Sequence, residues 1–121
     1  MLIVYALQEL IRSAIESEKP YIDYLVEGLD MVADIESDSL KGVMLVGAVL
    51  HEHHIGNNHA AAELMGLLLE HPAIDIEKRQ LLDMVRPDIE AALDEAEFKR
   101  LMEAGYTLSL EDAVSKAREK L

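Results

Sequence analysis

The stretch LKGVMLVGAVLHEHHIG (residues 40–56) decides how this chain of 121 residues folds. Up to Leu50 nearly every residue is apolar, whichever side of a helix it would occupy. A helix that is apolar on all sides belongs in the centre of a fold, where other helices cover it. We therefore expect a central helix from Leu40 to about His54, with Asp38 or Ser39 capping its first turn.

Three glycines lie in or directly after this expected helix. Gly42 and Gly47 lower its helix propensity by roughly 1 kcal/mol each relative to alanine. Their presence is explained if neighbouring helices approach closely at these two positions. Gly56 can adopt the left-handed backbone conformation that commonly ends a helix.

Apolar residues recur at three- and four-residue spacing on both sides of the central helix, which is the period of amphipathic helices. The pattern predicts six further helices: about 2–17, from Pro20 to Ala33, from Asn57 or Asn58 to about Glu70, from Asp75 to Leu93 with Pro87 inside it, from about Glu95 to Gly105, and 110–120 with Ser109 as its cap. Pro87 is expected either to kink its helix or to start a new one. No strand pattern competes, so we expect an all-α fold of about seven helices.

The first two expected helices resemble an earlier copy of the next two. Five apolar residues of the first pair recur about 38 residues later, a spacing typical of helical-hairpin repeats. The pairs are Leu7 and Leu45, Leu10 and Ala48, Ile22 and Ala60, Val26 and Leu64, and Leu29 and Leu67. The copy is imperfect, because Leu10 and Ile22 are large where the second pair has alanine.

The second pair of helices also fits the tetratricopeptide pattern of small and large positions. Ala48 and Ala60 take its small positions, Leu64 takes a large one and Pro72 the terminal proline. We expect a single domain (1–121) in which two helical hairpins (1–72) stack as tetratricopeptide-like repeats and are followed by C-terminal cap helices (73–121).

Charge and composition exclude several classes of partner. The formal net charge is −13, whereas nucleic acids and anionic membranes are bound by clustered Lys and Arg. We therefore expect neither partner. The chain has no cysteine, which excludes disulfides and cysteine-based zinc sites and favours a cytoplasmic location. The longest apolar run, GVMLVGAVL, is too short to span a bilayer.

The segment HEHHIGNNH (residues 51–59) contains four of the five histidines. The interpretation that we favour is structural: His51 occupies the position where the tetratricopeptide pattern prefers tyrosine and packs between helices. His53, His54 and His59 then line a hydrated turn at a helix C-terminus, where the helix dipole favours positive charge.

A metal site is the alternative interpretation of the same segment. His51 and His54 are three residues apart on one helix face, His59 begins the next helix, and three imidazoles can hold zinc. The zinc-protease motif H-E-x-x-H is not met, because Ile55 stands in the place of its second histidine. We therefore predict no bound metal or cofactor, and keep His51, His54 and His59 as the residues of the alternative.

Other catalytic signatures are missing from the sequence. It has no glycine-rich phosphate loop and no nucleophile elbow. Its many carboxylates are typical of hydrated helix faces, and we predict that the chain is not an enzyme.

Two segments carry a resemblance to a known group of proteins. GNNHAAAELMGLLLEHPAI (residues 56–74) and EAEFKRLMEAGYTLSLEDAVSKARE (residues 95–119) resemble the C-terminal region of large bacterial signalling ATPases and LuxR-type transcriptional regulators. The residues that match in the second segment are Phe98, Ala104, Gly105, Leu108, Ser109, Leu110, Glu111, Asp112, Ala113 and Val114. The resemblance covers roughly residues 40–120.

In that family the region is the end of a helical repeat array, which contacts partners and contributes no catalytic residue. The resemblance implies a non-catalytic protein–protein interaction or regulatory domain of a signal-transduction or transcription regulator. The NTPase and DNA-binding modules of the family are not in this sequence, so the chain is expected to be either part of a regulator or a small stand-alone relative. Its expected partners are another protein, modules of a parent protein or, in a homodimer, a second copy. The functional alternative is a small stand-alone protein that binds metal through residues 51–59.

Overall fold

A computed structural model describes residues 2–121, and within them the chain forms seven α-helices and no strand. The helices are α1 (Leu2–Glu16), α2 (Ile22–Ala33), α3 (Asp38–His54), α4 (Asn58–Glu70), α5 (Ile76–Ala92), α6 (Glu95–Gly105) and α7 (Leu110–Glu119). The predicted all-α fold class is confirmed, and the helix boundaries lie close to the predicted ones. Pro87 starts no new helix, because α5 continues through it. Among the described helices, none combines the length and the hydropathy that a bilayer span requires.

Short polar side chains cap the helices that follow α2. Asn57, Asp75 and Ser109 accept backbone N–H groups at the starts of α4, α5 and α7, as predicted. The predicted cap of α3 was wrong: Ser37 accepts the N–H of Leu40, and Asp38 is already helical. The prediction placed the helix start at the first apolar residue, Leu40. The first turn of α3 also includes Asp38 and Ser39, which are polar because they are exposed.

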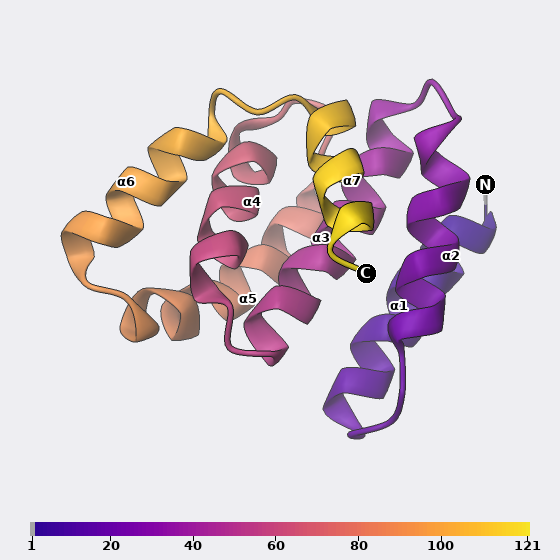
Figure 1. Cartoon of the computed structure of the whole chain (residues 1–121), viewed down its shortest axis with the longest axis horizontal. Helices are drawn as coiled ribbons and strands as arrows, with labels where there is room; N and C mark the ends of the chain where they lie inside the picture. The colour runs from indigo at the N-terminus through magenta and orange to yellow at the C-terminus, as the bar shows by residue number, and fades with distance from the viewer. Residues whose placement is uncertain (1) are drawn as a thin grey trace.

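Helix α3 lies in the centre of the fold, as its sequence predicted (Figure 1). It packs against α1, α2, α4, α5 and α7, and every residue from Lys41 to Glu52 is buried. The apolar part of this run supplies much of the hydrophobic core. The other helices can therefore present one apolar stripe each to a common centre.

The N-terminal helices form two antiparallel pairs, α1 with α2 and α3 with α4 (Figure 1). Helix α1 packs on α3, and α5 packs on α3 and α4. Helix α6 lies along α4, whereas α7 returns to pack on α2 and α3. The three C-terminal helices thus cover the two pairs on different sides.

Glycines mark the closest approaches between helices. A side chain at Gly47 would meet Ile11 Cδ1 of α1 at 3.3 Å, so the predicted close helix contact is confirmed there. At Gly42 it would overlap Ile74, which lies in the connection between α4 and α5 and not in a neighbouring helix. Three further close contacts were not predicted, and at Gly28 of α2 an added Cβ would overlap the end of the Met44 side chain of α3. At Gly66 and Gly105 an added Cβ would overlap backbone atoms of the facing helix, because α4 and α6 pack with their backbones nearly touching.

The imperfect copy between the two helix pairs has a structural counterpart. Leu10 is 45 % exposed and Ile22 39 % exposed, whereas Ala48, which corresponds to Leu10, is 2 % exposed. In the second pair, Ala48 is buried in the core, whereas Ala60 is only partly buried. On the outer side of α1 and α2 the larger residues remain open to solvent.

Candidate functional site

A pocket of about 380 Å³ lies where the C-terminal ends of α1 and α3 meet the middle of α5. Its volume falls within the range of about 300–1,000 Å³ that is typical of ligand pockets. Its apolar lining is Ile15 from α1, Leu50 from α3, and Leu81, Met84 and Val85 from α5. Its polar lining is Arg12, Glu16, His53 and His54. We call this surface, defined by these nine residues, the α1/α3/α5 groove.

Helix periodicity explains why these side chains converge. Leu81, Met84 and Val85 are three and four residues apart and therefore share one face of α5. Leu50 on α3 is buried and forms the base of the groove, whereas Met84 is 73 % exposed at its edge. When a partner covers a large, mostly exposed apolar side chain beside an apolar pocket, the buried apolar surface stabilises the complex.

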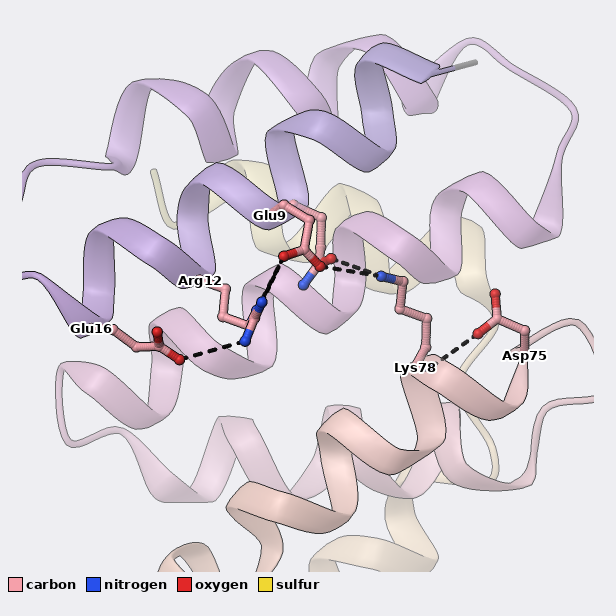
Figure 2. Close-up of polar contacts among 6 residues, drawn as sticks. Glu9, Arg12, Glu16, Asp75 and Lys78 are labelled. Atoms are coloured by element: carbon pink, nitrogen blue, oxygen red, sulfur yellow. Dashed lines mark hydrogen bonds and ion pairs between the residues drawn. The ribbon is translucent and has the colours of Figure 1, made fainter.

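A polar bridge between α1 and α5 lies next to the groove (Figure 2). Lys78 Nζ donates a hydrogen bond of 2.8 Å to Gln8 Oε1, lies 4.0 Å from Glu9 Oε1 and is 5.7 Å from the centre of the Tyr5 ring. Gln8 and Lys78 are both buried. Asp75 holds the same turn of α5 by accepting the backbone N–H of Lys78 at 2.9 Å. The bridge therefore fixes the position of α5 relative to α1 across α3.

The cation of the groove, Arg12, is paired with two carboxylates (Figure 2). Its Nη2 lies 2.8 Å from Glu9 and its Nη1 lies 3.6 Å from Glu16. The hydrogen bond to Glu9 is the main reason that the pKa of Arg12 lies above its ordinary value. Glu9 also lies 4.0 Å from Lys78 Nζ, so the two carboxylates of this cluster are balanced by two cations, Arg12 and Lys78.

Two of the clustered histidines line the groove. His53 Nδ1 forms a hydrogen bond of 2.8 Å with Asn58 Oδ1, and His54 is exposed, with its ring in a T-shaped arrangement with that of Tyr21. Both lie in the last turn of α3, at the predicted helix C-terminus. They contribute imidazole rings to the wall of a pocket, which the sequence interpretation as a hydrated turn did not anticipate.

His51 packs between helices, as the structural interpretation predicted. It is buried, and its Nδ1 forms a hydrogen bond of 2.6 Å with the Tyr21 hydroxyl at the start of α2. Burial is the largest cause that lowers the pKa of His51 and that raises the pKa of Tyr21. Burial therefore favours the uncharged forms of both side chains, the neutral imidazole of His51 and the protonated phenol of Tyr21.

The three histidines of the alternative metal site do not share one set of partners, although the rings of His51 and His54 both lie beside Tyr21. His51 contacts Tyr21, His54 borders the groove, and His59 pairs with Glu97 of α6. Within residues 2–121 no group of three or more His, Cys, Asp or Glu side chains has an arrangement that could hold a metal ion.

Some buried polar side chains were missed by sequence reasoning. Glu52 is buried rather than hydrated; it accepts a hydrogen bond of 2.8 Å from Asn57 Nδ2 and lies 3.9 Å from Lys120 Nζ. Gln8 had a detectable signal, because it lies one turn from both Val4 and Ile11 in the apolar stripe of α1. A polar residue in such a stripe indicates a buried partner. Lys78 carried no comparable signal.

Comparison of the chain with protein-family models, with curated proteins and with solved structures finds no match.

Proposed function

We propose that this chain is a non-catalytic, tetratricopeptide-like interaction domain that binds a segment of another protein in the α1/α3/α5 groove. The observation that carries the proposal is the exposed apolar edge of that groove, with Met84 beside a pocket of about 380 Å³. Apolar surface of this kind, bordered by polar side chains, is typical of sites that a protein partner covers.

The helix arrangement supports the repeat part of the proposal. Helices α1 and α3 each pack against the helix that follows them, and α1, α3 and α5 lie side by side in the order of the chain. In a stack of helical hairpins, the first helices of successive repeats line one extended surface. The exposed outer side of α1 and α2, with Leu10 and Ile22, is where another repeat or a second copy of the chain would pack.

We further propose that the domain acts in a bacterial signal-transduction or transcription regulator, in the cytoplasm. The support is the resemblance of residues 56–74 and 95–119 to the end of such regulators. Leu110, Ala113 and Val114 of the second segment are buried in α7 and have a packing role, as expected for a region without catalytic residues.

Site-specific photo-crosslinking tests the proposed function. A photoreactive phenylalanine analogue would replace Met84, and in a matched control it would replace Ile76. Both residues lie on α5 and are exposed, at 73 % and 70 %, but only Met84 lines the groove. In cells that express the chain, we expect one dominant cross-linked protein from position 84 that is absent from position 76.

Competition makes this result specific to the groove. Excess unlabelled chain should suppress the cross-link, whereas an excess of the Met84→Glu variant should not. Identical cross-links from both positions, or no cross-link from position 84, would contradict the proposal.

A further inference from the structure

The polar border of the groove identifies the charge of its partner, if the proposed function holds. Glu16 lines the groove with its side chain 67 % exposed and pairs with Arg12 at 3.6 Å. On the opposite side, Asp88 is exposed one helical turn after Met84 and so continues the groove-facing side of α5. Carboxylates therefore border the apolar lining on both flanking helices.

The groove offers no unpaired cation to an acidic partner. Arg12 is the only Lys or Arg in its lining, and Glu9 and Glu16 already balance its charge. Lys78 at the adjacent bridge is buried against Gln8. Since the whole chain carries a formal charge of −13, an acidic segment would be repelled at long range.

The shape of the groove suits a helix. Its walls are α1 and α5, and its base is the C-terminal end of α3 between them. Neighbouring packed helices lie roughly 8–10 Å apart, so the two walls are at most about twice that distance apart. A helix with side chains is about 10–12 Å wide and can lie over α3 with one apolar face in the pocket.

We propose that the α1/α3/α5 groove binds a positively charged amphipathic helix of a partner protein. Its apolar residues, spaced three and four apart, contact Met84 and Val85 in the pocket. Its Lys or Arg residues pair with Glu16 on one wall and Asp88 on the other. This inference rests on the proposed function and adds the chemistry of the partner.

Fluorescence anisotropy with two synthetic peptides tests the inference. Each peptide has about 14 residues, or four helical turns, with leucine at positions spaced three and four apart. One carries lysine and the other glutamate at its polar positions. We expect the lysine peptide to bind, and the glutamate peptide to bind at least about tenfold more weakly, a difference of about 1.4 kcal/mol.

Neutral variants separate the groove from general attraction to an acidic protein. Met84→Gln removes apolar contact without changing charge, and Ile76→Gln is its matched control on the same helix. We expect Met84→Gln to weaken binding of the lysine peptide about tenfold and Ile76→Gln to leave it unchanged. Circular dichroism would verify that both variants remain helical.

A second set of variants examines the carboxylates. Glu16→Gln with Asp88→Asn should weaken the lysine peptide several-fold. Glu103→Gln with Glu119→Gln removes the same charge from α6 and α7 and should have a smaller effect. Added salt should reduce the difference between the two double variants, because it screens exposed charge pairs.

The outcomes distinguish this inference from the proposed function. If the glutamate peptide binds more tightly and Met84→Gln weakens it, the predicted partner charge is wrong, but the groove remains an interaction site. If the lysine peptide binds equally well to wild type and Met84→Gln, the attraction is not specific to the groove and the inference fails. The inference also fails if neither peptide binds, whereas the proposed function is judged separately by the cross-link at position 84.

Discussion

Lys78 and Gln8, which lie 70 residues apart in the sequence, form a buried hydrogen bond of 2.8 Å that joins α5 to α1. The ammonium group can only donate, so Gln8 Oε1 faces it, and Gln8 Nε2 is buried without a hydrogen-bond partner among the described residues. A buried ammonium group requires such an acceptor, because an unpaired charge is strongly unfavourable in the protein interior. The bridge lies beside the groove and sets the spacing of its two walls.

Removal of Lys78 should therefore leave Gln8 Oε1 buried and unsatisfied. We expect Lys78→Met to reduce the free energy of unfolding by about 1–3 kcal/mol, measured by urea denaturation. The double variant Gln8→Leu, Lys78→Met replaces both partners by apolar groups. It should lose clearly less stability than the sum of the two single variants. If the loss of stability in the double variant equals the sum of the two single-variant losses to within about 0.5 kcal/mol, the two side chains are not coupled.

The contact between α4 and α6 should be intolerant of even one added methyl group. At Gly66 the new Cβ would overlap backbone atoms of Met102, and at Gly105 it would overlap the carbonyl of Glu63. Since backbone cannot move aside as a side-chain end can, we expect Gly66→Ala and Gly105→Ala to destabilise the fold by about 2 kcal/mol or more.

Gly47→Ala is the control for these two variants. Its Cβ would meet the end of the Ile11 side chain at 3.3 Å, which a small movement can relieve, and alanine raises helix propensity. We expect a change within about 1 kcal/mol in either direction. Equal losses for Gly47→Ala and Gly66→Ala in thermal unfolding would contradict the close backbone packing of α4 on α6.

The buried pair of His51 and Tyr21 should make stability depend on pH. An unfolded histidine has a pKa of about 6.5, and burial lowers the pKa of His51 in the folded chain. Between these two values the unfolded chain binds more protons than the folded chain, so protonation favours unfolding. The contribution of His51 is complete above about pH 6.5 and is lost as the pH falls through the folded-state value.

The His51→Gln variant isolates this effect from that of the many carboxylates. We expect wild type to lose more stability than His51→Gln when urea denaturation is repeated from pH 7.5 down to about pH 5. The two curves of unfolding free energy against pH should therefore converge at low pH. Parallel curves would show that His51 titrates alike in the folded and unfolded chains.

Local signals explain why the helices were predictable from sequence. The apolar period and the caps at Asn57, Asp75 and Ser109 depend on residues only a few positions apart, and the all-apolar run of α3 required a central place. The return of α7 to α2 and α3 was not predictable, because an amphipathic stripe indicates which face is buried but not against which helix.

The groove itself was not predicted from the sequence, for the same reason. His53 and His54 were singled out by their clustering, but the groove also needs Ile15 from α1 and Met84 from α5, which only the folded chain brings near them. Met84 is one of six methionines, and its sequence context resembles that of core methionines. Its exposure, which is the basis of the proposed function, follows from the tertiary packing of α5.

Leu10 and Ile11 are adjacent residues on α1 with opposite environments, and their variants should differ sharply. Ile11 is fully buried against α3, so Ile11→Ala should reduce the free energy of unfolding by about 2–5 kcal/mol. Leu10 is 45 % exposed, so Leu10→Gln should change it by no more than about 0.5 kcal/mol in dilute solution. Urea denaturation at two protein concentrations measures both effects. A loss for Leu10→Gln that grows with protein concentration would contradict this expectation and would mean that a second copy of the chain covers the outer side of α1.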